Sequence, residues 1–222
     1  NTLIRPAVSN VDIIAIVQST ASPKPRPYLM DKYFINVQKY DIDFILIWTK
    51  SDLIDDEAKE YIEVYKSVGI KSFIISEKAS DINEYDLLID FLKGKTTALA
   101  GVSGVGKSSL INKMCERKRM EVGSLSKKIE RGKHTTRHSE IFCIDKDTYI
   151  YDTPGFSSIE LSDMDEEDLE SYYREMAKLS GDCKFNKCSH ITEPNCKIKD
   201  ALNCGKISKI RYDNYTKIYQ EL

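Results

Sequence analysis

A glycine-rich segment in the middle of the chain restricts the possible folds more than any other part of the sequence. Residues 101–108 have the sequence Gly-Val-Ser-Gly-Val-Gly-Lys-Ser. They follow the apolar run Thr97 to Ala100, and Lys107 to Arg117 carries apolar residues at helical spacing. The segment matches the P-loop pattern in the context that the pattern needs, between a strand and a helix. Because backbone N–H groups converge in such a turn, the segment predicts an α/β fold with a phosphate site.

Short β-branched runs alternate with longer amphipathic segments along the chain, as in a parallel sheet with helices packed on it. The expected strands are Ile13 to Val17, Phe44 to Trp48, Ser72 to Ile75, Thr97 to Ala100, Glu140 to Ile144 and Thr148 to Tyr151. The expected helices are Tyr28 to Tyr40, Asp56 to Val68, Asn83 to Leu92 and Lys107 to Arg117. We therefore predict an α/β, doubly wound, mainly parallel six-stranded sheet.

A small helical C-terminal domain is expected beyond this sheet. Ser162 with Asp165 three residues later resembles a capping box that opens an acidic helix to about Leu179. From Ile207 onward, apolar residues at helical spacing predict a terminal helix. We place the domain boundary near Gly181, which gives domains of residues 1–180 and 181–222.

The predicted phosphate site takes residues from two strand ends. Lys107 supplies a positive charge toward the β- and γ-phosphate oxygens, and Ser108 can ligate Mg²⁺. After the strand that ends at Tyr151, Asp152 can hold Mg²⁺ through water and Gly155 can bring an N–H to the γ-phosphate. Taken alone, the second segment could also be an ordinary Asp-Pro-Gly turn. The full set predicted around the phosphates is Gly101, Val102, Ser103, Gly104, Val105, Gly106, Lys107, Ser108, Ser109, Asp152 and Gly155.

A third segment, Thr49-Lys50-Ser51-Asp52, follows the expected strand Phe44 to Trp48 and predicts which base is bound. A carboxylate at Asp52 can accept hydrogen bonds from guanine N1–H and the 2-amino group, whereas adenine offers neither donor. The Lys50 stem can cover the base, and Ser76 at the next strand end can add a contact to the guanine oxygen. We predict a guanine site, with a P-loop kinase or ATPase as the alternative that Asp52 disfavours.

Three cysteines and a histidine near the C-terminus predict a metal site. Cys183, Cys188, His190 and Cys196 supply three thiolates and one imidazole within a short loop, which suits a closed tetrahedral zinc centre. Such a small segment lacks a large core, so the zinc would be structural. Buried free thiols or a redox pair are the alternative. Cys115, Cys143 and Cys204 are expected to be core or surface thiols outside this site.

The charge pattern bears on partners and location. A formal net charge of −2 gives no global field that would attract nucleic acid or a membrane. Two local basic regions, residues 113–137 and 184–217, could contact RNA phosphates, although a charge run is usually only a solvated surface. The acidic stretch Glu160 to Glu175 is expected to be solvated or paired internally. No apolar run approaches the length of a membrane span, so we expect a cytoplasmic monomer without a membrane partner.

The order of these motifs is unusual, because the segment beginning at Thr49 precedes the P-loop by about fifty residues. With this permuted order, the sequence resembles the circularly permuted, small-ribosomal-subunit-dependent GTPases of the RsgA (YjeQ) family. The similar segments are Asn1 to Asp12, Gly101 to Asn112, His134-Thr135-Thr136, the cysteine cluster and the final helix. The family's N-terminal OB-fold domain is not found in this sequence, and Thr49 stands where most GTPases have Asn.

The resemblance implies GTP hydrolysis with Mg²⁺, stimulated by the small ribosomal subunit and its rRNA, in late maturation of that subunit. Phe156 occupies the position where many GTPases use Gln to orient water, and an apolar ring cannot do so. The resemblance points to His134 as the catalytic residue, and Thr136 or Thr135 is expected to ligate Mg²⁺. The alternatives are a permuted GTPase for another RNA or ribosomal particle, and a zinc-stabilised RNA-binding module with vestigial nucleotide binding.

Overall fold

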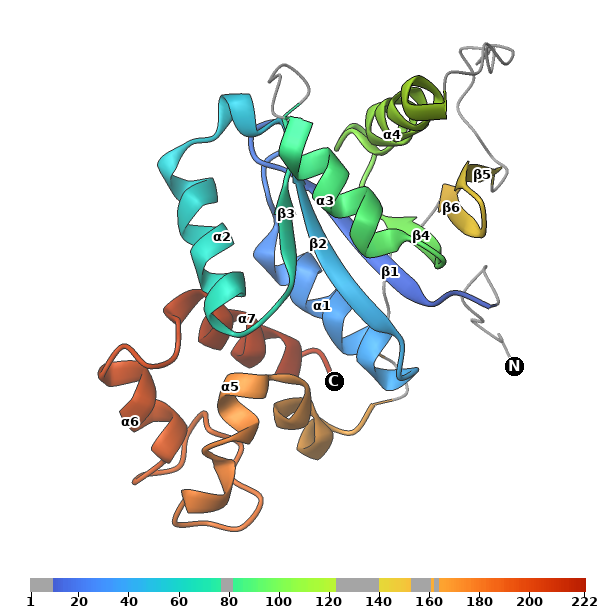
Figure 1. Cartoon of the computed structure of the whole chain (residues 1–222). Helices are drawn as coiled ribbons and strands as arrows, with labels where there is room; N and C mark the ends of the chain where they lie inside the picture. Colours follow the sequence, from blue (N-terminus) through green and yellow to red (C-terminus); the bar gives the residue numbers. More distant parts are fainter. Residues whose placement is uncertain (1–9, 77–81, 123–139, 153–160, 162–163) are drawn as a thin grey trace. The chain divides into compact units, whose positions relative to one another are not determined.

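The structure is a computed structural model that describes residues 10–76, 82–122, 140–152, 161 and 164–222 (Figure 1). Contacts divide the chain into two compact units. The first contains residues 1–25, 42–59 and 71–158, and the second contains residues 26–41, 60–70 and 159–222. The expectation that residues 181–222 form a domain of their own stays a prediction. None of the helices in the described part of the chain has the length and apolar character of a membrane span.

The first unit is built on a six-stranded sheet, as predicted. Its strands are β1 (Ile13–Ser19), β2 (Asp43–Thr49), β3 (Ser72–Ile74), β4 (Thr96–Ala100), β5 (Glu140–Asp145) and β6 (Thr148–Asp152), in the order β3-β2-β1-β4-β6-β5. All neighbouring pairs are parallel except β5 and β6, which are joined by a short turn and run antiparallel. The complete burial of β1 explains the unbroken apolar run Ile13 to Val17, because both faces of a central parallel strand are covered.

Two helices of the first unit, α3 (Ile82–Leu92) and α4 (Lys107–Val122), pack against the sheet (Figure 1). Alternate residues of β1, namely Ile13, Ala15 and Val17, belong to the same buried cluster as Leu88 of α3 and Ile111 of α4. This alternation follows from the two-residue repeat of a strand. The apolar core therefore fixes the register in which the strands reach the phosphate-binding edge.

The parallel register brings several strand ends to one edge of the sheet. The last residue of β1, Ser19, lies opposite Thr49, the last residue of β2. Leu99, near the end of β4, lies opposite Asp152, the last residue of β6. Loops that are far apart in the sequence therefore leave the sheet at the same edge, which is where open α/β folds bind ligands.

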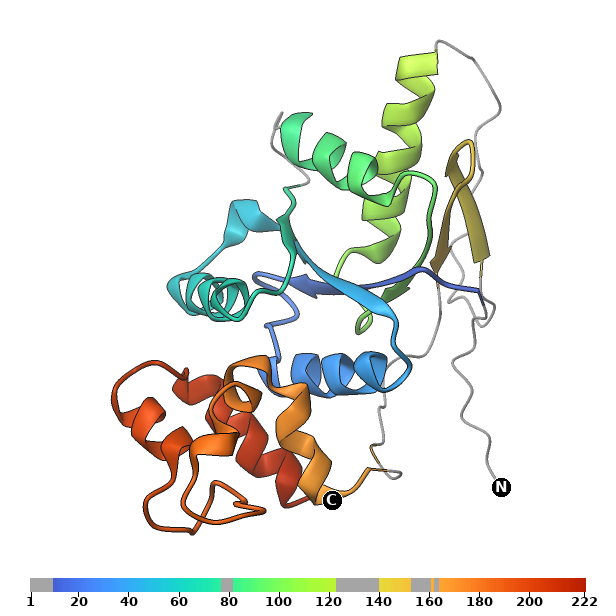
Figure 2. The ribbon, with the colours of Figure 1, turned by 60° about the horizontal axis from the view of Figure 1, so that its bottom comes forward.

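The second unit is helical (Figure 2). Its elements are α1 (Pro27–Lys39), the part of α2 (Asp56–Ser67) from residue 60 onward, the 3₁₀ helices η2 (Glu166–Tyr172) and η3 (Ser180–Asp182), α5 (Arg174–Ala177), α6 (Lys197–Asn203) and α7 (Lys209–Tyr219). One core includes residues of α1, η2, α5, α6 and α7, among them Ile35, Leu169, Met176, Ile198 and Tyr215. The terminal helix predicted from Ile207 is confirmed as α7.

The prediction of one acidic helix running to Leu179 was wrong. The segment instead forms η2 and the four-residue α5, with Tyr173 between them in an extended conformation (φ −101°, ψ 91°). Asp165 precedes η2 but makes no side-chain capping bond. The break buries Leu169, Tyr173 and Met176 completely. Burial of these apolar side chains outweighs the local preference for a continuous helix.

A buried ion network lies in the second unit. Asp31 of α1 is 0% exposed and Arg211 of α7 is 3% exposed. Arg211 Nη1 donates to Asp31 Oδ1, and Arg211 Nε donates to Glu175 Oε1 at 2.7 Å. Asp31 also accepts hydrogen bonds from Tyr65 Oη at 2.9 Å and from Asn214 Nδ2 at 2.7 Å. The network therefore links α1, α2, α5 and α7 within this unit.

Candidate active site and metal centre

The P-loop lies between the end of β4 and the start of α4, as its sequence predicted. A Cβ atom at Gly101 would lie 2.5 Å from the carbonyl oxygen of Val17, so only glycine fits against β1. Gly104 and Gly106 have φ values of +81° and +96°, which side-chain-bearing residues rarely adopt. Such a backbone turns successive N–H groups toward one concave surface at the helix N-terminus, where an anion is stabilised.

Lys107 begins α4 and folds back over the loop. Its Nζ donates to the carbonyl oxygens of Gly101 at 2.6 Å and Val102 at 3.2 Å. Burial lowers the pKa of Lys107, and the negative charge of Asp152 opposes this effect. Asp152 lies at the end of β6, next to the β4 strand that leads into the P-loop. The structure therefore brings the predicted cation and the predicted carboxylate to one edge of the sheet.

Thr49 connects the predicted base-binding segment to the P-loop. The residue is 2% exposed, and its hydroxyl donates to the carbonyl oxygen of Val105. The carbonyl oxygen of Gln18 lies 3.2 Å from the same hydroxyl. A short side chain thus makes a direct hydrogen bond between two loops that are separated by 56 positions in the sequence.

Lys50 makes a second link between the same loops. Its backbone is left-handed (φ 58°), and its carbonyl oxygen accepts a hydrogen bond from Thr20 Oγ1 at 2.7 Å. Its Nζ donates to the carbonyl oxygens of Ser22 and, at 2.9 Å, of Gly104. Sequence reasoning missed Thr20 and Ser22, because a Pro-rich connection gives no pattern that identifies a binding loop. The only available signal was their position at the end of a buried parallel strand.

Asp52 and Ser76 also lie close together. Ser76 Oγ lies 3.5 Å from Asp52 Oδ1, and Ser51 N donates to the carbonyl oxygen of Ile75 at 3.2 Å. The segment after β3 therefore borders the segment after β2. An exposed carboxylate beside a serine hydroxyl suits a ligand edge that carries hydrogen-bond donors.

Four predicted nucleotide-site residues lie outside the described residues. They are His134, Thr135, Thr136 and Gly155. The catalytic role of His134 and the Mg²⁺-ligand role of Thr136 or Thr135 stay predictions. Phe156, which occupies the usual glutamine position, is also outside the described residues.

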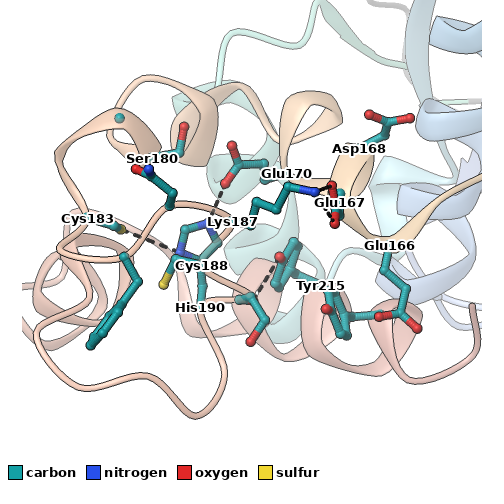
Figure 3. Close-up of a pocket in the computed structure, with 15 residues that line it drawn as sticks. Glu166, Glu167, Asp168, Glu170, Ser180, Cys183, Lys187, Cys188, His190 and Tyr215 are labelled. Atoms are coloured by element: carbon teal, nitrogen blue, oxygen red, sulfur yellow. Dashed lines mark hydrogen bonds and ion pairs between the residues drawn. The ribbon is translucent and has the colours of Figure 1, made fainter.

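The predicted metal ligands come together in the second unit. Figure 3 labels three of them, Cys183, Cys188 and His190. The ligand atoms of Cys183, Cys188, His190 and Cys196 all lie within 4.8 Å of one another. Cys183 Sγ is 4.0 Å from Cys196 Sγ, and His190 Nδ1 is 3.7 Å and 3.3 Å from these two sulfurs. Tetrahedral zinc bonds imply S–S and S–N separations of about 3.8 Å and about 3.6 Å. The donor set and its spacing therefore fit a zinc ion.

Hydrogen bonds hold the backbone of this metal-binding loop. Ser189 N and Oγ donate to the Glu193 carboxylate at 2.8 Å and 2.9 Å. Two tyrosines of α7 donate from the other side, Tyr212 to the carbonyl oxygen of His190 at 2.8 Å and Tyr215 to that of Ser189 at 3.0 Å. The terminal helix thus positions the loop from which His190 projects.

The remaining cysteines lie apart from this cluster, as predicted. Cys115 is buried in the core of the first unit, whereas Cys143 and Cys204 are exposed. The acidic stretch is partly paired, also as predicted, because Glu170 contacts His190 and Glu175 contacts Arg211. Glu170 is a residue that sequence reasoning missed, since nothing in its local pattern relates it to a histidine 20 positions later.

The P-loop, the carboxylate at the end of β6 and the base-binding segment after β2 define a P-loop GTPase whose motifs are circularly permuted along the chain. A sequence model of the RsgA GTPase family matches residues 1–162. The small ribosomal subunit biogenesis GTPase RsgA of Agathobacter rectalis is 44% identical over all of this chain and 73% of the relative. The protein of the same name from Ruminiclostridium cellulolyticum is also 44% identical, over 99% of this chain and 72% of the relative.

Two solved structures are similar over nearly the whole chain. The circularly permuted GTPase YloQ matches with a TM-score of 0.74 and 33% identity, over 96% of this chain and 68% of its own. YjeQ from Thermotoga maritima matches with a TM-score of 0.78 and 32% identity, over 99% of this chain and 74% of its own. The chain belongs to the RsgA GTPase family. It is therefore an enzyme that hydrolyses GTP, and membership implies the use of guanine nucleotide and Mg²⁺.

Proposed function

We propose that this chain is a cytoplasmic GTPase that acts in late maturation of the small ribosomal subunit and whose hydrolysis that subunit stimulates. The observation that carries the proposal is the 44% identity, over the whole chain, to proteins named small ribosomal subunit biogenesis GTPases. In this role hydrolysis would act as a timed release step, because loss of the γ-phosphate changes the loops that contact it.

The residues around the P-loop are assigned to the phosphates of GTP. The backbone of residues 101–106 and Ser109 would cradle them, and the Lys107 ammonium would exchange its carbonyl contacts for β- and γ-phosphate oxygens. Ser108 and Asp152 would hold Mg²⁺, which neutralises developing phosphate charge when bound. Gly155 would donate its N–H to the γ-phosphate. The left-handed glycines and the position of Lys107 support these assignments.

The segment from Thr49 to Asp52 is assigned to guanine. Asp52 would accept hydrogen bonds from N1–H and the 2-amino group, while the Lys50 stem would cover the base and Ser76 would border its oxygen. The Thr49 hydroxyl, which contacts the P-loop carbonyl of Val105, would align the base site with the phosphate site. A threonine can therefore make the inter-loop link at the position where most GTPases have asparagine.

Hydrolysis is proposed to depend on a group outside the usual glutamine position. His134 would orient the attacking water, because the Phe156 ring cannot polarise it. Thr136, or its neighbour Thr135, would complete the Mg²⁺ ligands. If the small ribosomal subunit positions the His134 segment at the γ-phosphate, GTP hydrolysis is slow without the subunit and is stimulated by it.

The cluster formed by Cys183, Cys188, His190 and Cys196 is proposed to hold a structural zinc ion. Three thiolates and one imidazole leave no position for substrate, and a closed site of this type contributes folding stability. The separations of the sulfur and nitrogen atoms support zinc as the ion.

We assign rRNA contact to the exposed tip of the metal-binding loop. Four cations of the basic segment pair with carboxylates, namely Lys187, Lys197, Lys209 and Arg211. Lys184 is exposed, and its Nζ lies over the Phe185 ring, which is 43% exposed. A cation next to an exposed aromatic face suits an RNA backbone with a stacked base. The chain would act as a monomer.

The test is the GTP hydrolysis rate with and without purified small ribosomal subunits. Large subunits and ATP serve as the particle and nucleotide controls. We expect stimulation by small subunits only, with GTP only, and loss of that stimulation in His134→Ala. Stimulation by large subunits or by unrelated RNA would instead identify a permuted GTPase for another particle. No stimulation with hydrolysis intact would contradict the ribosomal role of this chain.

A further inference from the structure

One contact of the metal cluster reaches outside the four predicted ligands. His190 is 1% exposed in its side chain, and Glu170 Oε2 lies within hydrogen-bonding distance of its Nε2 atom (Figure 3). The other ring nitrogen, Nδ1, faces the sulfurs of Cys183 and Cys196. The imidazole therefore lies between a carboxylate on one side and two thiol sulfurs on the other.

The 3₁₀ geometry of η2 places this carboxylate. With three residues per turn, positions three apart lie one above the other, so Glu167 and Glu170 share a face of the helix. Both line a cavity of about 400 Å³ next to the metal-binding loop. Glu167 pairs with Lys187 at 2.8 Å, and Glu170 contacts His190 one turn later. In an α-helix, positions three apart also share a face but are offset by about 60° around the axis, so the 3₁₀ geometry stacks the two carboxylates more directly.

The contact between Glu170 and His190 determines which ring nitrogen of the imidazole carries the proton. Neutral histidine carries one N–H donor and one lone pair, and its partner decides which nitrogen holds the proton. A carboxylate can only accept, so Glu170 holds the proton on Nε2 and leaves the lone pair on Nδ1. That lone pair points to the position that a metal ion would share with the thiolates.

We propose that Glu170 is a positioning residue for the metal centre, which fixes the tautomer and the ring orientation of His190. This inference rests on the zinc site proposed above. Carboxylates that accept from a ligating histidine typically contribute a factor of about 10–100 in metal affinity. Glu170 also ties η2 to the metal-binding loop, so the ion, when bound, stabilises the acidic segment as well as the cysteine segment.

The experiment measures zinc affinity of the full 222-residue chain by competition with a chromophoric chelator, for the parent, Glu170→Ala and Glu170→Gln. The matched control is Glu167→Ala, which removes the same charge one turn earlier in η2 without touching a ligand. Cobalt(II) absorption provides a second readout, because a thiolate-to-cobalt band reports whether the cysteines still bind.

We expect a loss of about 10–100-fold in zinc affinity for Glu170→Ala, with the thiolate–cobalt band retained at saturation. A smaller loss is expected for Glu170→Gln, whose amide oxygen still accepts a hydrogen bond, and none for Glu167→Ala. Equal affinities of Glu170→Ala and the control would overturn the inference. If Glu170→Ala does not fold, Glu170→Gln decides, and parental affinity in that variant overturns it. A parent chain without a thiolate–cobalt band would instead refute the zinc site itself.

Discussion

Removal of the Arg211 charge is expected to destabilise the second unit severely. In Arg211→Met the apolar stem remains, but the Asp31 carboxylate stays in a site that is 0% exposed. Glu175 also loses the hydrogen bond that its Oε1 accepts from Arg211 Nε at 2.7 Å. The guanidinium group lies 4.3 Å from the centre of the Tyr173 ring, and that contact is lost as well. Breaking a buried ion pair by removing one partner costs about 3–5 kcal/mol, so we expect a loss of that size in the free energy of unfolding.

The pH dependence of the variant gives an independent check. Burial raises the pKa of Asp31, and the attraction of Arg211 opposes that rise. Without Arg211 the pKa of Asp31 in the folded state rises further above its unfolded value of about 3.9. A carboxyl group of this kind stabilises the fold at low pH and loses that contribution as the pH rises through its folded pKa. The stability deficit of Arg211→Met should therefore shrink as the pH falls from neutral toward the unfolded value.

The assay is urea unfolding followed by circular dichroism, with Lys209→Met as the matched control. Lys209 is an exposed cation on the same helix that pairs with exposed Asp213, so its loss should cost less than about 1 kcal/mol. The double variant Arg211→Met/Asp31→Asn should recover part of the loss, since the isolated charge is gone. An Arg211→Met variant within about 1 kcal/mol of the parent at neutral pH would refute the reasoning.

Three further perturbations test the proposed sites. Thr49→Val removes the hydrogen bond from the Thr49 hydroxyl to the Val105 carbonyl oxygen, which contributes about 1–1.5 kcal/mol, so GDP binding should weaken by about tenfold. Thr49→Ser keeps the hydroxyl and should bind GDP as the parent does. Calorimetry measures both affinities. Lys107→Ala should lower the affinity for GTP by about 10–100-fold, because charge-assisted hydrogen bonds to the phosphates are lost. Parental affinity in that variant would contradict the phosphate role. Lys113→Ala, which removes an exposed lysine of the same helix, is the control. Cys196→Ser should reduce zinc stoichiometry and lower the Tm, whereas Cys204→Ser, an exposed thiol of the same unit, should change neither.

The sheet of the first unit could be predicted because its signals are local. β-branched runs identify strands, and the P-loop pattern identifies the strand-to-helix turn that ends β4. The cysteine spacing likewise predicted a set of atoms that the fold brings within 4.8 Å. In each case the residues that act together are near one another in the sequence, or follow strands whose parallel order brings their ends together.

The contacts that could not be predicted join distant segments through single side chains. Glu170 meets a histidine 20 positions later, and the η2 helix that carries it is held by Leu169, which is buried in a core that several helices share. Thr49 reaches Val105 only when β2 and the P-loop are in place. Neither contact has a local pattern, since tertiary packing determines both.

The permuted guanine site is tested most sharply by comparing the affinities for guanine and xanthine nucleotides in the parent and in Asp52→Asn. An aspartate pairs with the N1–H and 2-amino donors of guanine, whereas an asparagine can donate to the 2-oxo group of xanthine. We predict that the parent binds GDP at least about 100-fold more tightly than XDP or ADP, and that Asp52→Asn reverses the preference between GDP and XDP. An unchanged preference for GDP in Asp52→Asn would mean that the segment after β2 does not bind the base, and would contradict the permuted nucleotide site.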